Sequence, residues 1–257
     1  MDGTPAIEIA GVSKHLGGHA ILEAIDLAIA PGSFVALIGP SGAGKTTLLK
    51  IVNRLIEPDS GRITVNGVDS ASLPVERLRR DIGYVIQGVG LFPHMSVADN
   101  IWIVPRLDGA KAEGRDARVA ELLRLVALPE AMASRFPRSL SGGQAQRVGV
   151  ARALAASPAI MLMDEPFGAL DPATRDELGR AYRDLHDRLS LTTVMVTHDV
   201  GEALLLADRI IMLREGRIAA DGTPAGLAAG HADPAVRATI DVPRRQAERL
   251  AALGRAS

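Results

Sequence analysis

The chain has 257 residues, of which 47% are hydrophobic and 23% are charged, and its formal net charge is −1. This length and composition suit one globular domain, or one domain with an inserted lobe. The near-neutral charge argues against a nucleic acid or an anionic membrane surface as a partner, and the absence of cysteine excludes thiol catalysis, thiolate metal sites and disulfides.

The N-terminal sequence MDGTPAIEIAG contains no basic stretch followed by an apolar one, so we expect no secretory signal. A transmembrane helix needs about 20 apolar residues, and the longest apolar runs, such as 203–207, are much shorter. We therefore expect any action at a membrane to depend on a partner.

The first third of the chain has the pattern of short strands separated by turns. Pro31-Gly32 and Asp59-Ser60-Gly61 are turn signals, and Asn66-Gly67 is typical of a hairpin. Aliphatic-rich strands are predicted at 7–12, 22–29, 34–38, 62–65 and 82–86.

The periodicity becomes helical between about residues 97 and 157, where Val119, Leu122, Leu123 and Val126 fit one apolar helix face. Within this region, 108–118 is polar and is predicted to be a solvent-facing connection. Alternating strands and helices then follow, with strands at 159–163, 192–197 and 209–213 and helices at 172–189 and 199–207. Such alternation predicts a parallel sheet with helices on its faces, so we expect an α/β core interrupted by a helical lobe.

A glycine-rich loop lies between the strand at 34–38 and a helix predicted at 48–55, and it has the spacing G-x-x-x-x-G-K-[ST]. Backbone N–H groups of such a loop cradle phosphate oxygens. Lys45 supplies charge to the β- and γ-phosphates, the Thr46 hydroxyl is suited to Mg²⁺, and the helix that begins near Gly44 adds its dipole. The expected phosphate-binding residues are Gly39, Pro40, Ser41, Gly42, Ala43, Gly44, Lys45, Thr46 and Thr47.

Two carboxylates, Asp164 and Glu165, follow the apolar residues 160–163. Many buried strands end in an acidic residue, so a purely structural role is an equal alternative when this pattern is taken alone. Beside a phosphate loop, Asp164 is a candidate for holding Mg²⁺ through water, and Glu165 is a candidate general base for the attacking water. Met161 and Met163 are expected to pack in the core.

A second helix start suited to phosphate lies at residues 140–144, with the sequence Leu-Ser-Gly-Gly-Gln. The helix is predicted to run to about residue 156. After Leu140, the segment comprises Ser141, Gly142, Gly143 and Gln144, of which the serine and the two glycines open the helix.

These motifs, in this order, resemble the ATPase subunits of ABC transporters over about residues 7–237. The resemblance implies a P-loop NTPase fold of the ABC-ATPase type, with a RecA-like core, an antiparallel β subdomain and an inserted α-helical subdomain at about 90–157. A short helical tail at 238–257 would follow. In this family, residues 39–47 correspond to the Walker A loop, 160–164 to Walker B and 168–171 to the D-loop, and the cofactors are ATP and Mg²⁺.

The resemblance also implies roles for individual residues. Residues 141–144 correspond to the signature motif, which completes the ATP site of a second subunit. Gln87 occupies the position of the family's Q-loop glutamine, which contacts Mg²⁺ and the attacking water. Glu165 takes the place of the catalytic base, and His198 that of the switch histidine, which contacts the γ-phosphate. The other histidines are expected to have ordinary structural or surface roles.

The adenine end of the site departs from the family pattern. An aromatic residue usually stacks on adenine near residues 14–17, where this chain has Leu16 beside His15. Stacking on an aromatic side chain contributes about 1–3 kcal/mol, while Leu16 offers only apolar contact. We therefore expect weaker ATP binding or looser nucleotide discrimination.

Residues 82–105 and 147–172 resemble more narrowly the importer ATPases for glycine betaine, choline and other quaternary amines. The group often has glutamine where this chain has Gly88. Some of its members carry C-terminal regulatory domains, for which 222–257 is too short, so we expect no ionic-strength sensing of that type.

Partner contacts are expected after Gln87, where the family receives the coupling helices of the permease. Leu91, Phe92, Pro93 and Trp102 are candidates for this groove, although Trp102 fits the core of the helical lobe equally well. The basic, weakly amphipathic tail at 242–253 is expected to be a solvated terminal helix.

The implied assembly is a head-to-tail pair of identical or homologous copies bound to transmembrane permease subunits, with an extracytoplasmic binding protein as an indirect partner and no nucleic acid. Its place would be the cytoplasmic face of the inner or plasma membrane. An importer ATPase for amino acids or similar solutes is an alternative. A soluble ABC ATPase acting on ribosomes or DNA is disfavoured by the single cassette, and a nucleotide switch without turnover by Glu165 and His198.

Overall fold

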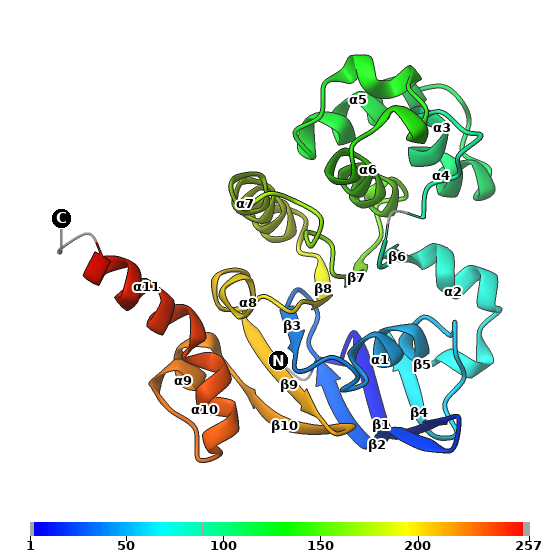
Figure 1. Ribbon diagram of the computed structural model, residues 1–257. Helices are drawn as coiled ribbons and strands as arrows, with labels where there is room; N and C mark the ends of the chain where they lie inside the picture. The colour runs from blue at the N-terminus through cyan, green and yellow to red at the C-terminus, as the bar shows by residue number, and fades with distance from the viewer. Residues whose placement is uncertain (1–2, 89, 254–257) are drawn as a thin grey trace.

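The computed structural model describes residues 3–88 and 90–253 (Figure 1). Its strands are β1 (Ile7–Leu16), β2 (His19–Ile29), β3 (Phe34–Ile38), β4 (Ser60–Val65), β5 (Val68–Asp69), β6 (Ile82–Val85), β7 (Ile160–Asp164), β8 (Thr192–Val196), β9 (Arg209–Arg214) and β10 (Arg217–Gly222). Its α-helices are α1 (Lys45–Val52), α2 (Val75–Asp81), α3 (Val97–Ile101), α4 (Ile103–Leu107), α5 (Arg115–Leu125), α6 (Gly142–Leu154), α7 (Pro172–Leu189), α8 (Val200–Leu206), α9 (Pro224–Ala229), α10 (Pro234–Ile240) and α11 (Val242–Leu253). Short 3₁₀ turns lie at η1 (Ser70–Ser72), η2 (Glu130–Ser134) and η3 (Pro137–Ser139).

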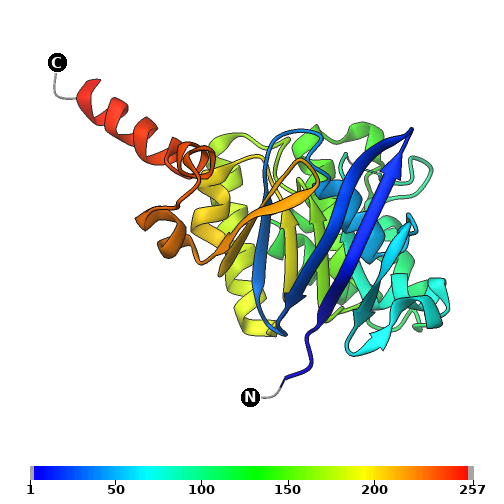
Figure 2. The same ribbon diagram turned by 90° about the horizontal axis from the view of Figure 1, so that it is seen from below.

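The strands form two sheets. The larger has the order β10-β9-β3-β8-β7-β6, and all its neighbours are parallel except β10, which pairs antiparallel with β9. The smaller sheet, β2-β1-β4-β5, is antiparallel throughout. Figure 2 shows the long strands β1 and β2 in front of the larger sheet. The predicted parallel sheet with helices on its faces is therefore present, with an antiparallel sheet beside it.

Helix α1 packs between the two sheets. The side chains of β3 alternate in direction: Val35 and Leu37 join the core that contains α1, whereas Phe34 faces the opposite core. Since both faces of the larger sheet are covered, all five residues of β3 are buried and apolar. This arrangement holds the residues that follow β3 at the edge of a rigid sheet.

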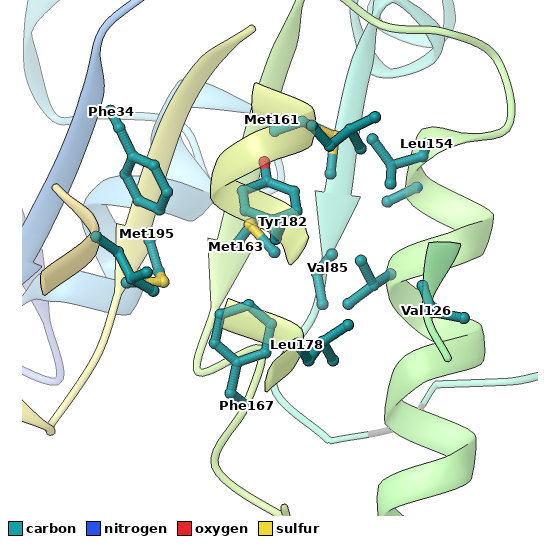
Figure 3. Close-up of a cluster of buried hydrophobic side chains, with 14 of the residues drawn as sticks. Phe34, Val85, Val126, Leu154, Met161, Met163, Phe167, Leu178, Tyr182 and Met195 are labelled. Atoms are coloured by element: carbon teal, nitrogen blue, oxygen red, sulfur yellow. The ribbon is translucent and has the colours of Figure 1, made fainter. Parts of the chain in front are cut away.

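The opposite core joins the larger sheet to α7 and to the helical lobe (Figure 3). Tyr182 of α7 packs edge-on against Phe34, with ring centroids 5.9 Å apart. Met161 and Met163 are fully buried in the same cluster, in agreement with the packing role expected for them.

The helical lobe consists of α3 to α6 and is the green group in Figure 1. The four residues predicted to form an apolar face, Val119 to Val126, are buried there. The end of the solvent-facing connection predicted at 108–118 was placed too late in the chain. Helix α5 already begins at Arg115, after Gly114, which has a φ of 84°. Arg115 is held by Asp99, with Nη2 2.6 Å from Oδ1.

Several short elements had no counterpart in the prediction: α2, β10, α9 and α10. Strand β10 is held by backbone hydrogen bonds to β9, with which it pairs antiparallel. Its own sequence contains few apolar residues, so it gives no clear strand pattern. The helix predicted at 48–55 corresponds to α1, which starts three residues earlier, at Lys45, and ends three residues earlier, at Val52. Within the described ranges, no helix has the length and apolar character needed to cross a membrane.

The tail forms helix α11, which has no buried residue and extends away from the body in both views. Its exposed leucines, Leu250 and Leu253, agree with a solvated helix.

Candidate functional site

The loop between β3 and α1 can be built only with glycine at two positions. A Cβ on Gly39, where φ is 139°, would collide with the carbonyl oxygen of Leu213 on β9. A Cβ on Gly44, where φ is 97°, would lie 2.6 Å from Leu22 Cδ2 and 2.7 Å from the Ile21 carbonyl oxygen. The loop is therefore pressed against neighbouring backbone, and its shape is fixed before any ligand binds.

Lys45 begins α1 and is only 5% exposed. Its Nζ donates to the carbonyl oxygens of Gly39 and Pro40 at 2.8 and 2.9 Å, so the ammonium group is held over the loop. Burial lowers the pKa of Lys45, although the charges of Glu165 and Asp164 act in the opposite direction. These two carboxylates are the counter-charges of a buried cation.

Thr46 and Asp164 meet between α1 and the end of β7. The Thr46 hydroxyl donates to Asp164 Oδ1 at 3.0 Å. Asp164 is fully buried, and burial raises its pKa while the bond from Thr46 lowers it. Its second oxygen, Oδ2, has no protein hydrogen-bond partner within 3–88 and 90–253.

Glu165 is the point on which the other predicted catalytic residues converge. Its Oε1 accepts a hydrogen bond from Gln87 Nε2 at 3.2 Å and lies 2.8 Å from His198 Nε2. The side chain is 25% exposed, so the carboxylate remains accessible. Gln87 follows β6 and His198 follows β8, and both strands flank β7 in the sheet.

The backbone at Glu165 is strained. Its φ is 49°, in the left-handed region that a non-glycine residue rarely adopts. Two bonds hold it there: its N–H donates to the Val196 carbonyl oxygen at 3.0 Å, and its own carbonyl oxygen accepts from Gln146 Nε2 at 2.6 Å. The fold thus maintains an unfavourable conformation that points this carboxylate toward the phosphate loop.

A cavity of about 300 Å³ lies at this junction, and its lining joins the phosphate loop to Gln87, Glu165 and His198. The lining residues are Ile21, Ser41, Gly42, Ala43, Gly44, Lys45, Thr46, Thr47, Gln87, Glu165 and His198. The geometry suits an anionic ligand with its phosphates on the loop and a carboxylate base at the far end.

The donor set near Thr46 fits Mg²⁺ bound together with a nucleotide. The described residues contain no group of three or more histidine or acidic side chains that could hold a metal ion. Mg²⁺ usually takes one or two carboxylates, substrate phosphates and water. The buried, unpartnered Oδ2 of Asp164 and the neighbouring Thr46 hydroxyl match that preference.

The second predicted phosphate segment, Ser141 to Gln144, does not line this cavity. It begins α6 in the helical lobe with a capping box, in which Ser141 Oγ accepts from Gln144 N at 3.2 Å and Gln144 Oε1 accepts from Ser141 N at 3.0 Å. Gly142 is exposed. The structure therefore separates this helix start from the chain's own phosphate loop.

Two linking residues were missed by the sequence reasoning. Gln146, only 5% exposed, connects α6 to the Glu165 carbonyl oxygen and to the backbone N–H of Ala169. Arg175 joins α7 to the segment after His198, with Nη1 3.2 Å from Asp199 Oδ2. Each contact depends on tertiary packing, so no local pattern signals either residue.

Leu16 also lies outside the cavity lining, where Ile21 is the apolar residue instead. Leu16 is 44% exposed at the end of β1. Its neighbours are tied to Asp59, which accepts from Lys14 Nζ and from His15 N, both at 2.6 Å. The bond from Lys14, followed by that from His15, lowers the pKa of Asp59 to about 2.

Replacing Leu16 with tyrosine is expected to strengthen ATP binding about tenfold and to leave GTP binding less changed, because an aromatic ring adds a stacking surface of about 1–3 kcal/mol. Isothermal titration with each nucleotide measures the effect. Exposed Leu189 on α7 offers a control, Leu189→Tyr, which should leave both affinities unchanged. Unaltered ATP and GTP affinities in Leu16→Tyr would contradict an adenine contact here.

Glu202, in the first turn of α8 near His198, is a half-buried acid. Burial raises its pKa from 4.5 to about 7; the charge of Asp199 acts in the same direction, while Thr197 and Arg175 oppose it. Because the folded chain holds this proton more tightly than the unfolded chain, the stabilisation is complete below about pH 4.5 and is lost as the pH rises through about 7. That difference corresponds to up to roughly 3 kcal/mol of unfolding free energy.

The variant Glu202→Gln is therefore expected to match the wild-type stability at pH 4 and to exceed it at pH 8, since the amide is neutral at both. Urea unfolding at the two pH values measures the difference. Glu177→Gln, at an exposed position of α7, is the matched control. Equal stability of the variant and the wild type at both pH values would show that the Glu202 carboxylate is well solvated, and a wild-type advantage at pH 8 would show that the fold favours its charged form.

Comparison with known proteins gives the following similarities. Residues 22–168 match the family described as ABC transporter. The chain is 52% identical over 219 residues to the glycine betaine/carnitine/choline transport ATP-binding protein OpuCA of Bacillus subtilis (strain 168), covering 85% of this chain and 58% of that protein. It is 50% identical over 218 residues to the glycine betaine uptake system ATP-binding protein YehX of Escherichia coli (strain K12), covering 85% and 71%.

Among solved structures, the dimeric post-hydrolysis state of the ATP-binding cassette MJ0796, bound to ADP and Pi, superimposes with a TM-score of 0.79 at 34% identity. The match covers 85% of this chain and 98% of that one. The chain thus has the fold of that cassette and covers nearly all of it, whereas it spans 58% of the length of the B. subtilis relative.

Proposed function

Because the chain belongs to the ABC transporter family and has the fold of its ATPase cassettes, we propose that it binds and hydrolyses ATP to power an importer. One observation carries the proposal. Gln87 and His198 converge on Glu165 across a cavity whose other wall is the phosphate loop. A switch that only binds nucleotide needs no such arrangement around a carboxylate.

The residues divide the chemistry between them. The loop N–H groups and Lys45 bind the β- and γ-phosphates and offset their charge. Glu165 accepts the proton of the attacking water as a general base. Gln87 and His198 orient the Glu165 carboxylate through the bonds described above. His198 also lines the cavity beside the phosphate loop, where it would stabilise charge that develops on the γ-phosphate.

Thr46 and Asp164 are the residues that would hold Mg²⁺, which supplies charge neutralisation at the β- and γ-phosphates when bound. The hydroxyl of Thr46 and the buried Oδ2 of Asp164 are the oxygens available for this purpose. Their link at the junction of α1 and β7 keeps both oxygens at the phosphate end of the cavity.

We further propose that two copies pair head to tail, so that Ser141 to Gln144 of one copy complete the ATP site of the other. Three observations support this pairing. The signature segment does not line its own cavity, and that cavity is at the small end of the range for ligand sites, about 300–1,000 Å³. The similar cassette MJ0796 is described as dimeric.

The proposed cargo is a quaternary amine such as glycine betaine, carnitine or choline, because these names describe the similar transport proteins. The chain would be held at the cytoplasmic face of the membrane by permease subunits. Exposed Phe92 and Pro93 are candidates for that contact, and buried Asn100 fixes their loop, with Oδ1 accepting from Phe92 N at 2.7 Å and Nδ2 donating to Phe92 O at 3.1 Å.

The test is solute uptake by host cells from which the gene has been deleted. Cells complemented with the wild-type gene are expected to take up labelled glycine betaine or choline, whereas cells complemented with Lys45→Ala are not. Labelled amino acids serve as the comparison. Loss of amino-acid uptake instead would favour another importer class, and loss of neither would contradict a role in importing these solutes.

A further inference from the structure

Strand β6 carries a tyrosine with no role in the site as described so far. Tyr84 stands opposite Leu162 in the register of β6 and β7. Side chains two residues apart on a strand share a face, so Asp164 lies on the same face as Leu162 and is a diagonal neighbour of Tyr84. With strands about 4.8 Å apart and a rise of about 3.3 Å per residue, such neighbours lie roughly 8 Å apart, within reach of an aromatic side chain. Both side chains therefore occupy the layer between the larger sheet and α1.

Tyr84 and Asp164 each keep one buried oxygen that lacks a hydrogen-bond partner in the described part of the chain. These atoms are the Tyr84 hydroxyl and Asp164 Oδ2. Buried polar groups are almost always paired, directly or through an ordered water. A phenol can donate and a carboxylate can accept, so the two atoms are complementary. A carboxylate oxygen has two lone pairs, so Oδ2 can accept from this side and still be available to Mg²⁺.

The charges around this pair agree with the geometry. Burial and then the negative charge of Asp164 raise the pKa of Tyr84, so the hydroxyl keeps its proton and remains a donor. Asp164 also interacts with the charge of Lys50. Lys50 lies four residues after Thr46 on the same face of α1, one turn farther along the helix.

We propose that Tyr84 is a positioning residue for Asp164. Its hydroxyl donates to Asp164 Oδ2 through one bridging water, while Thr46 holds Oδ1. The carboxylate is thereby fixed from two sides at the place where Mg²⁺ would bind. This inference rests on the proposed function, and it adds a residue outside the phosphate loop to the metal site.

The experiment compares Tyr84→Phe with Tyr182→Phe. Tyr182 is a matched control because its hydroxyl is also buried, but it bonds Thr193 Oγ1 at 2.9 Å in the opposite core. Mn²⁺ binding to the ADP-bound protein is measured by electron paramagnetic resonance, and ADP binding is measured separately in EDTA. Loss of an outer partner of a metal ligand typically weakens metal binding 10–100-fold.

Tyr84→Phe is expected to weaken Mn²⁺ binding about tenfold and to leave metal-free ADP binding unchanged. Tyr182→Phe should bind Mn²⁺ as the wild type does. Wild-type Mn²⁺ affinity in Tyr84→Phe, equal weakening in both variants, or loss of metal-free ADP binding in Tyr84→Phe would each overturn the positioning role.

Asp164→Asn separates this inference from the proposed function. If Asp164→Asn loses Mn²⁺ while Tyr84→Phe retains it, the role of Tyr84 fails and the proposed metal site stands. If the wild-type protein holds no Mn²⁺ with ADP, the proposed metal site fails and the inference fails with it, while phosphate release by the wild type decides the proposed function separately.

Discussion

The variant Glu165→Gln is expected to hydrolyse ATP about a thousandfold more slowly than the wild type while still binding it, because general-base catalysis contributes about 10²–10⁴-fold. Glutamine keeps an oxygen that can accept from Gln87 and His198, so the local arrangement is preserved. Its neutral amide cannot take the proton of the attacking water. Binding and chemistry should therefore separate in this one variant.

Single-turnover phosphate release measures the rate, and size-exclusion chromatography with light scattering measures the assembly. Glu165→Gln with ATP and Mg²⁺ is expected to elute as a dimer that persists, because closure is no longer followed by hydrolysis. Glu177→Gln is the control for loss of an acidic side chain. Phosphate release at the wild-type rate would remove Glu165 from the base role, and a monomer at saturating ATP would contradict the pairing of the isolated chain.

Mixing two inactive variants, Lys45→Ala and Gly142→Asp, is expected to restore hydrolysis. Lys45→Ala removes the buried charge over the phosphate loop. Gly142→Asp places a negative charge on the exposed signature segment, and a Cβ there meets no atom within 4 Å, so the folded chain accommodates it. Its harm should appear only across the interface, where it faces the phosphates bound to the other copy.

Each variant alone is expected to lose about 100-fold or more in rate, since removing one charge-stabilising group typically costs that much. In a mixed dimer, both changes fall in one composite site and the second site carries neither. If equal amounts mix freely and the sites act independently, the rate should recover to roughly a quarter of the wild type in such a symmetric pair.

Phosphate release at constant total protein measures the recovery, and native mass spectrometry counts the mixed dimers. The control mixes Lys45→Ala with the double variant Lys45→Ala/Gly142→Asp, which leaves no intact composite site. If mixed dimers form and the mixture stays inactive, the ATP site is not shared between copies.

The sequence predicted the elements whose signals are local. Helix α7 was predicted at its observed bounds, since Asp171 caps it by accepting from Thr174 N and Pro172 follows at the first position. Strand β3 was predicted equally well, because a short apolar run before a glycine-rich loop is a strong pattern. Strand β10 was missed, since its conformation depends on pairing with β9 rather than on its own residues.

The candidate site divides in the same way. The sequence by itself predicted the phosphate loop, because its glycines, Lys45 and Thr46 form one short pattern between a strand and a helix, although contacts with Leu213 and Ile21 hold the loop in place. Only the tertiary structure brought Gln87 and His198 onto Glu165, since Gln87 and Glu165 are 78 residues apart. The tertiary structure also placed Tyr84 diagonally across from Asp164 on neighbouring strands. It brought the Gln146 side chain to the backbone carbonyl of Glu165.

The physical reason is the parallel sheet. The carboxyl ends of parallel strands meet at one edge, so the segments after β3, β6, β7 and β8 become neighbours whatever their separation in the chain. The spacing of residues in the sequence does not show which strands are neighbours in the sheet. It also does not show which buried side chains lie on the same face of the sheet. The sequence by itself therefore identified the candidate phosphate loop. The fold decided that the candidate catalytic groups meet and that Ser141 to Gln144 lie apart from that loop.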